Sequence, residues 1–263
     1  MSTRVAPVGI FDSGIGGLSI LQSLQNERPA EHYVYFADTA YAPYGEKGEA
    51  HAVARSLAIA RCLLEEHGAK ALVVACNTAT AAAIAALRAQ YPTLPIVGVE
   101  PALKPALALT RTGHIGVMAT RGTVNSAKFI DLLGTLADQA RFTVTPCDGL
   151  AQAIESQDRT KIRALIQEYT SAKGTFGTEI GAIDTLVLGC THYPLEQAEF
   201  RSILGPDITL VEPGAAVARQ LSRLLGPCEQ RECSGHITWL TSAEDTGPLM
   251  QAVNRWMPPN GTN

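Results

Sequence analysis

Two cysteines occupy matching positions in the two halves of the chain. Cys76 lies in the stretch ACNTATAAA, directly after the apolar run Leu72–Val74, and Cys190 lies in GCTHYP, directly after Leu186–Leu188. A thiol between a strand and a helix lies near the positive end of the helix dipole, which favours the thiolate. Asn, Thr and backbone N–H groups at a helix start can also hold a carboxylate. The two stretches therefore predict two reactive thiols beside a bound acid.

Three chemistries could use two such thiols. A disulfide redox couple is one, although conventional redox cysteines are adjacent in sequence, and Cys76 and Cys190 are not. A thiol nucleophile with His192 as its base is another, but it leaves Cys76 without a role. The third uses both cysteines symmetrically: two acid/base groups on opposite faces of one carbon remove a proton from one side and return one to the other. Such a pair inverts a stereocentre.

The glycine-rich stretch FDSGIGGLS at residues 11–19 also has two interpretations. It could be a tight strand–helix turn, or a dinucleotide-binding loop with Asp38 as the acid that binds a ribose. Against the dinucleotide loop, Ser19 replaces its third glycine, and Asp12 would put a carboxylate beside a pyrophosphate. Asp12 fits better as an acid near a thiol and a substrate ammonium.

The stretch YAPYGEK at residues 41–47 is expected to be a loop with a sharp turn at Gly45. It could serve only as a structural turn, or it could contact the substrate.

Short β-rich runs alternate with helical patterns along the chain, which is typical of parallel sheets covered by helices on both faces. Strands are predicted over 7–12, 32–38, 71–76, 95–100, 114–119, 141–147, 185–190, 208–214 and 236–242. Helices are predicted over 17–27, 50–67, 78–90, 102–109, 124–136, 149–155, 159–172, 215–225 and 244–256.

The two halves of the chain look related. Glu100 follows Cys76 by 24 residues, Glu212 follows Cys190 by 22, and both glutamates lie in the tripeptide Val-Glu-Pro. We therefore predict an α/β fold of two similar domains, each a mostly parallel sheet flanked by helices. Pseudo-symmetry would relate the domains, with the active site in the cleft between them. Domain one would comprise residues 1–98 plus 213–263 with Cys76, and domain two residues 99–212 with Cys190.

Composition excludes several classes of partner. Of the 263 residues, 46% are apolar and 17% charged, and the net charge of −4 gives no general attraction to nucleic acid or an anionic membrane. No apolar stretch resembles a signal peptide or a membrane span, so a cytoplasmic location is expected. The cysteines show no metal-ligand spacing, so we expect free thiols and no metal. They are Cys62, Cys76, Cys147, Cys190, Cys228 and Cys233.

Five stretches together resemble the glutamate racemases of the cofactor-independent aspartate/glutamate racemase superfamily. They are GIFDSGIGGLSIL, YFADTAYAPYGEK, VVACNTATA, PIVGVEPALKPA and LVLGCTHYPL, in order from residue 9 to 195. The resemblance implies interconversion of L- and D-glutamate without a cofactor, with D-glutamate supplied to bacterial peptidoglycan. It also implies two catalytic cysteines, here Cys76 and Cys190, the first taking the α-proton from D-glutamate and the second from L-glutamate.

The resemblance carries further residues over. Asp12 would assist Cys76, His192 would assist Cys190, and Glu155 in LAQAIES matches an acid near the second thiol. Contacts with the small-molecule substrate, glutamate, would come from Asp12, Ser13, Tyr44, Gly45, Asn77, Thr78, Thr191 and His192.

Two alternatives stay open from the sequence. One is an aspartate racemase of the same superfamily, and the other is a non-catalytic two-lobed protein that binds a small acid. Two retained thiols argue against pure binding, which needs no second acid/base group. The oligomeric state is also open, with a homodimer as one option.

Overall fold

The computed structural model describes residues 6–172, 174–227 and 235–257. The chain divides into two compact units, unit 1 with Met1–Val99 and Gly214–Asn263, and unit 2 with Glu100–Pro213. It leaves unit 1 within the first Val-Glu-Pro tripeptide and returns directly after the second.

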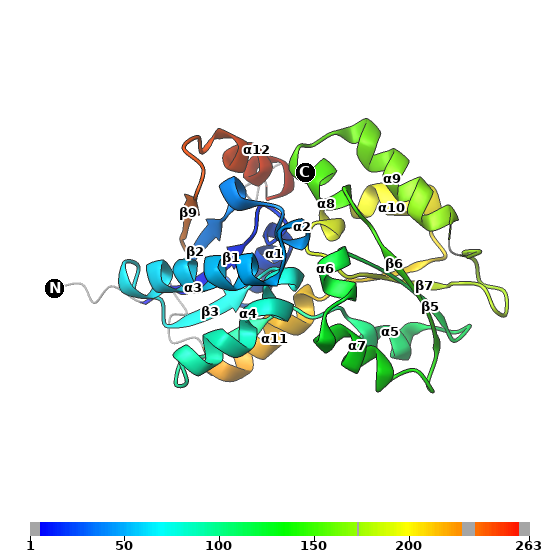
Figure 1. The fold of residues 1–263 in the computed structure, drawn as a ribbon, viewed down its shortest axis with the longest axis horizontal. Helices are drawn as coiled ribbons and strands as arrows, with labels where there is room; N and C mark the ends of the chain where they lie inside the picture. Colours follow the sequence, from blue (N-terminus) through cyan, green and yellow to red (C-terminus); the bar gives the residue numbers. More distant parts are fainter. Residues whose placement is uncertain (1–5, 173, 228–234, 258–263) are drawn as a thin grey trace. The chain divides into compact units, whose positions relative to one another are not determined.

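Unit 1 is built on a five-stranded sheet in which every neighbouring pair of strands is parallel (Figure 1). The strand order is β4-β3-β1-β2-β9. The strands are β1 (Val8–Asp12), β2 (Tyr33–Ala37), β3 (Ala71–Val74), β4 (Ile96–Gly98) and β9 (Ile237–Thr241). β1 and β3 are buried throughout, as expected for central strands covered on both faces. Because all strands run the same way, the residues that follow β1, β2 and β3 lie along one edge of the sheet.

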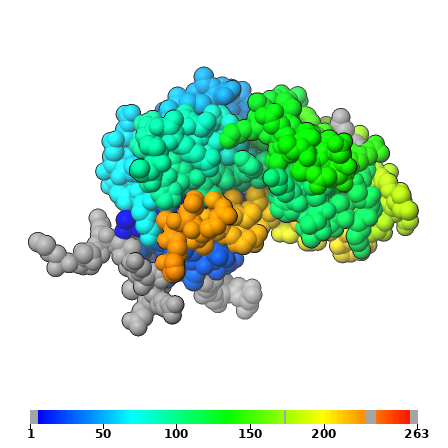
Figure 2. All heavy atoms as spheres, turned by 90° about the horizontal axis from the view of Figure 1, so that it is seen from below, coloured from blue at the N-terminus to red at the C-terminus, as the bar shows by residue number. Residues whose placement is uncertain are grey.

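Helices cover both faces of this sheet. α1 packs on α11, and α3 packs on α4, with α11 (orange) visible at the surface in Figure 2. The helices of unit 1 are α1 (Leu18–Glu27), α2 (Tyr44–Lys47), α3 (Glu49–Glu65), α4 (Asn77–Gln90), α11 (Gly214–Leu225) and α12 (Gly247–Trp256), with a 3₁₀ turn, η1 (Thr39–Tyr41). One face of α3 packs inward: Ala60 is buried, and Val53, Leu57 and Leu64 contact the core cluster beneath it.

Unit 2 contains a four-stranded sheet of order β6-β5-β7-β8, again entirely parallel. Its strands are β5 (His114–Ala119), β6 (Arg141–Pro146), β7 (Thr185–Leu188) and β8 (Thr209–Val211). Its helices are α5 (Leu103–Leu109), α6 (Arg121–Val124), α7 (Ala127–Gly134), α8 (Leu150–Glu155), α9 (Arg159–Ser171) and α10 (Gln197–Leu204), with a 3₁₀ turn, η2 (Tyr193–Glu196). One core cluster lies under α8, α9 and α10, where Ile162 and Ile166 are fully buried, and a second lies under α5 and α7.

The structure differs from the predicted elements in several places. The helix predicted over 124–136 begins later, at Ala127 (α7), and Val124 instead ends a separate short helix, α6, because the hydroxyl oxygens of Thr120 and Ser126 each accept an N–H at a separate helix start. Helix α10 has no counterpart among the predicted helices. The predicted loop with a sharp turn at Gly45 is wrong. Gly45 lies within the short helix α2, and the left-handed backbone position falls at Gly48, with φ of +87°.

Among the described residues, no helix is both long enough and apolar enough to cross a membrane.

Candidate active site: a buried thiol in each unit

Cys76 lies at the carboxyl edge of the unit 1 sheet and begins α4. It is the N-cap residue of that helix, and its sulfur accepts the backbone N–H of Ala79 at 3.4 Å. The thiol is buried, with 5% exposure. A sulfur in this position accepts a hydrogen bond from a backbone amide and lies at the positive end of the helix dipole. Both interactions stabilise a thiolate more than a thiol.

Asp12 and Ser13 lie beside this thiol because β1 and β3 are neighbours, with Phe11 opposite Val74. The fully buried carboxylate of Asp12 accepts the Ser13 hydroxyl at 3.0 Å and the Gly14 N–H at 2.9 Å through the same oxygen. Ser13 Oγ is 3.7 Å from the sulfur of Cys76. A chain of polar groups therefore leads from Cys76 through Ser13 to Asp12.

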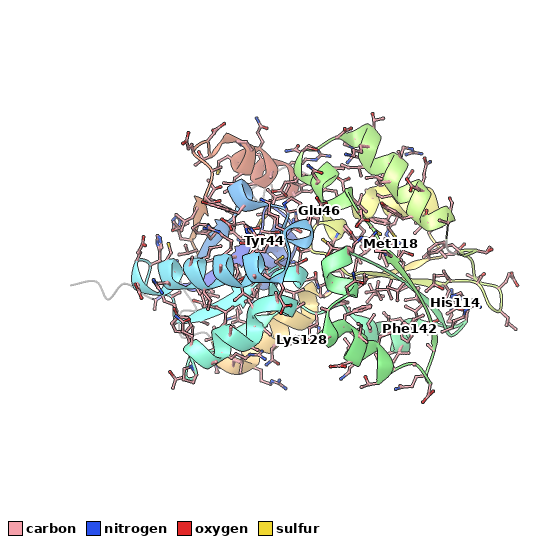
Figure 3. All side chains as sticks on the ribbon, in the orientation of Figure 1. Tyr44, Glu46, His114, Met118, Lys128 and Phe142 are labelled. Carbon is pink, nitrogen blue, oxygen red and sulfur yellow. The ribbon has the colours of Figure 1, made fainter. Side chains whose placement is uncertain are left out.

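Asn77 and Tyr44 also lie close to Cys76. Asn77 is buried, its amide nitrogen donates to the carbonyl of Val99 at 3.3 Å, and its Oδ1 accepts no hydrogen bond from the described residues. Tyr44, labelled in Figure 3, comes from α2. It packs in the same apolar cluster as Cys76. Gly45 and Thr78 are half-buried. Unit 1 thus places Asp12, Ser13 and Tyr44 near the first thiol, and Asn77 directly follows it. Gly45 and Thr78 are the chain neighbours of Tyr44 and Asn77.

The structure argues against the dinucleotide-binding loop, because Asp38, the acid that would bind a ribose, already has other partners. Asp38 is fully buried and accepts hydrogen bonds from the guanidinium of Arg55 and the phenol of Tyr44. A carboxylate held in this way is not available to a ribose.

Cys190 occupies the corresponding place in unit 2, at the carboxyl edge beyond β7. Its sulfur is 3.7 Å from Nδ1 of His192, and Nε2 of His192 is 2.7 Å from a carboxylate oxygen of Glu155, at the end of α8. Cys190, Thr191 and His192 are buried, and Glu155 is partly exposed. Unit 2 therefore aligns a thiol, an imidazole and a carboxylate, and brings together all four residues that the sequence predicted there.

The second thiol lacks the regular helix start expected after it. The chain continues into the 3₁₀ turn η2, and α10 begins only at Gln197. His192 supplies the charge instead. Burial lowers the pKa of His192, but Cys190 and Glu155 more than offset this and raise the pKa well above its ordinary value. A protonated His192 places a positive charge beside the sulfur of Cys190.

Cys147 is a neighbour of the second thiol that sequence reasoning did not single out. It is buried, its thiol lies 3.3 Å from the carbonyl oxygen of Thr145, and it is close enough to Cys190 for their charges to interact. Burial, and then the charge of Cys190, raise the pKa of the Cys147 thiol far above its usual range. This shift favours the protonated thiol, so Cys147 is a poor candidate for a base. Cys62, Cys76, Cys147 and Cys190 are free thiols, and Cys228 and Cys233 lie outside the described residues.

Within the described ranges, one group of side chains could hold a metal ion: the ligand atoms of Cys62, Glu66 and His67 lie within 4.8 Å of one another. This group is at the end of α3, directly before the chain enters β3, whereas Cys76 follows β3. The group thus lies at the opposite edge of the sheet from the thiol of Cys76.

The protein is therefore of the parallel α/β class, built as two units, with a buried thiol at the carboxyl edge of each sheet. Within this class, the chain belongs to the Asp/Glu/hydantoin racemase family, whose model matches residues 17–221.

A glutamate racemase of Ectopseudomonas mendocina is 49% identical over 231 residues, which are 87% of this chain and 86% of that protein. Among solved structures, a glutamate racemase of Bacillus anthracis superposes with a TM-score of 0.82 at 28% identity, covering 97% of this chain and 95% of that one. The Escherichia coli glutamate racemase in complex with L-glutamate and the activator UDP-MurNAc-ala superposes with a TM-score of 0.81 at 32% identity, over 95% of each chain.

Proposed function

We propose that this protein is a glutamate racemase that interconverts L- and D-glutamate by two-thiol proton transfer at the α-carbon. The observation that carries the proposal is that each buried thiol has its own polar partners: Ser13 and Asp12 at Cys76, and His192 and Glu155 at Cys190. The relatives named above, all glutamate racemases, support glutamate over aspartate as the substrate.

In the proposed reaction, the Cys76 thiolate removes the α-proton of D-glutamate, and the C–H electron pair stays on the α-carbon as a carbanion. The Cys190 thiol then donates its proton to the opposite face of that carbon, which yields L-glutamate and a Cys190 thiolate. The reverse direction begins at Cys190 and ends at Cys76. No cofactor or metal ion takes part in either direction.

The difficulty of this reaction is that an α-proton is a very weak acid and a thiolate is only a modest base. The site must therefore stabilise the carbanion with hydrogen-bond donors and exclude water. The buried amides at the start of α4 are such donors, and the unpartnered Oδ1 of Asn77 can accept from the substrate ammonium. The remaining proposed contacts to glutamate come from Ser13, Tyr44, Gly45, Thr78, Thr191 and His192.

The cell context follows from the same proposal. D-glutamate is a component of bacterial peptidoglycan, so the enzyme would supply cell-wall synthesis from the cytoplasm. The homodimer stays a prediction, which sedimentation of the purified protein tests.

The deciding experiment is circular dichroism of L-glutamate and, separately, D-glutamate, incubated with the purified protein after dialysis against a chelator and an aldehyde-trapping reagent. We expect the signal to decay to zero from either side, and aspartate to be a poor substrate. A large loss of rate that added pyridoxal phosphate or metal restores would contradict the proposal.

Cysteine variants test the assignment of the two bases. Cys76→Ser and Cys190→Ser should each abolish net racemisation, because a serine alkoxide is not accessible near neutral pH. Cys62→Ser and Cys147→Ser are matched controls, one in each unit, and both should keep turnover within a few-fold of wild type. Near-normal turnover in either catalytic variant would overturn the two-thiol mechanism.

A further inference from the structure

We propose that Asp38 and Arg55 form a positioning pair for the first thiol, holding Tyr44 and the helix α2 against Cys76 so that proton transfer at that thiol is efficient. This inference rests on the proposed racemase function, and it adds two residues that do not touch the substrate.

The two side chains make a bidentate contact between a buried carboxylate and a partly exposed guanidinium. Asp38 directly follows β2 and is fully buried, and its two carboxylate oxygens accept Nε and Nη2 of Arg55 on α3, each at 2.8 Å. A bidentate arginine–carboxylate contact fixes orientation as well as distance. The backbone N–H of Asp38 also donates to the carbonyl oxygen of Asp12 at 3.0 Å. The pair is therefore attached to the same strand end that carries Asp12.

The pair holds the segment between β2 and α3 at two points. The phenol of Tyr44 donates to the carboxylate of Asp38, and the guanidinium of Arg55 lies 3.7 Å from the ring centroid of Tyr41. His51 contacts the edge of the Tyr44 ring, with 5.6 Å between the ring centroids. Contacts of Asp38, Arg55 and His51 with Tyr41 and Tyr44 thus hold η1 and α2 in place.

This segment in turn bears on Cys76. Tyr44 is 1% exposed and belongs to the same core cluster as Cys76, and α2 packs against α4, the helix that Cys76 caps. The charge of Cys76 is close enough to Tyr44 to contribute to the raised pKa of that phenol, after burial and the interaction with Asp38. Tyr44 therefore stays a neutral donor, and its contribution is to fix a position and not to transfer a proton.

The test begins from Arg55→Met, which keeps the apolar stem and removes the guanidinium. The matched control is Lys70→Met in the same unit, because Lys70 also pairs at 2.8 Å with a buried carboxylate, that of Glu31, but precedes β3 at the far edge of the sheet. We expect Arg55→Met to lower kcat/KM for glutamate by about 10²-fold, the loss that a misplacement of about 1 Å can cause. Lys70→Met should stay within a few-fold of wild type.

The readout that separates positioning from simple destabilisation is the primary isotope effect. If Arg55→Met slows only the step at Cys76, the isotope effect with α-deuterated D-glutamate rises, since Cys76 removes that deuteron. With α-deuterated L-glutamate the effect falls towards 1, because Cys190 then acts before the slow step. The proposal would be overturned if the isotope effect changed equally from D- and from L-glutamate. It would also be overturned if a less stable variant kept the wild-type isotope effects.

Two milder variants keep the test decisive if Arg55→Met does not fold. Tyr44→Phe removes only the phenol oxygen and leaves the Asp38–Arg55 pair in place, and it should produce the same asymmetric isotope pattern with a smaller loss. Arg55→Lys retains the charge and should recover part of the activity. If the wild-type protein fails to racemise glutamate, the proposed function is refuted. If the wild type is active but the variants change the isotope effects equally in both directions, only the positioning pair is refuted.

Discussion

At the scale of single residues, the two thiols reach the same chemistry by different means. The sulfur of Cys76 accepts a hydrogen bond from the backbone N–H of Ala79 at the start of a regular helix of 14 residues. Cys190 precedes a short 3₁₀ turn, and the imidazole of His192 lies beside it instead. A helix start does not titrate, but an imidazole does. The half-reaction at Cys190 should therefore depend more strongly on pH than the half-reaction at Cys76.

Glu155→Gln tests this dependence. The carboxylate helps to raise the pKa of His192 above its ordinary value, so its removal should lower that pKa. The imidazolium is then lost at a lower pH, and we expect the alkaline limb of kcat for L-glutamate to move to lower pH. Profiles of kcat against pH in both directions measure the shift. Glu168→Gln, the same charge change at an exposed position on α9, should leave the profile unchanged.

The same shift has a consequence for stability. The pKa of His192 is higher in the folded protein than in the unfolded chain, so protonation of His192 stabilises the folded state. This stabilisation is fully present below the unfolded pKa, near 6.5, and is lost as pH rises through the folded pKa. Glu155→Gln should therefore destabilise the protein more at pH 6 than at pH 9. An equal loss at both pH values would mean that Glu155 does not control the protonation of His192.

Racemisation sets a further constraint on these kinetics. L- and D-glutamate have equal free energies, so kcat/KM must be the same in both directions for every variant. Variants at Asp12 or His192 can therefore be asymmetric only in kcat and KM separately. We expect Asp12→Asn and His192→Asn to lower kcat more than they weaken binding.

At the scale of elements, two glycines allow close packing beside the candidate site residues. Gly17, at the start of α1, packs against the end of β1, and Gly189, after β7, packs against β5. A Cβ on Gly17 would lie 2.8 Å from the Tyr35 hydroxyl and 2.9 Å from Cβ of Asp12, and one on Gly189 would lie 2.9 Å from the carbonyl oxygen of Met118 on β5. Contacts this short force neighbouring atoms to move. Glycine at these positions is therefore required by packing around Asp12 and Cys190.

Gly17→Ala should lower the free energy of unfolding by about 1–3 kcal/mol, the usual cost of overpacking. It should also lower turnover, because the Cβ of Asp12 is among the atoms that the new methyl group would displace. Gly134→Ala is the control, since a Cβ there meets no atom within 4 Å. Urea unfolding of both variants measures the difference. If Gly17→Ala proves as stable as the control, the strand end is more adaptable than its contacts indicate.

Periodicity and strand-end motifs predicted most of this architecture, because each depends on local sequence. The parallel strands and the surroundings of Cys76 and Cys190 follow from such patterns. The start of α7 at Ala127, later than the predicted residue 124, depends on one capping hydroxyl, that of Ser126, which a hydrophobic period does not record. The pairing of Asp38 with Arg55 joins residues 17 positions apart on different elements. Only the three-dimensional fold brings those two residues together.

At the scale of the whole molecule, the reaction imposes a geometry on the two units. The chain crosses between them twice, at Val99–Glu100 and at Pro213–Gly214, so these junctions could serve as a hinge. We propose that unit 1 and unit 2 correspond to two catalytic domains, with one substrate held between them. The proposal requires both thiols to reach a single α-carbon.

A crystal structure of the protein with glutamate bound would test this requirement. Each sulfur must come within about 3–3.5 Å of the α-carbon, the separation of a near-attack complex. The sulfurs of Cys76 and Cys190 should therefore lie about 7 Å apart on opposite faces of that carbon, and further apart without substrate. A disulfide needs its sulfurs about 2 Å apart, so peptide mapping after mild oxidation should find no bond between these cysteines. Sulfurs on opposite surfaces of the molecule, or bonded to each other, would contradict the two-base mechanism, because neither arrangement allows one carbon to lose and regain a proton on opposite faces.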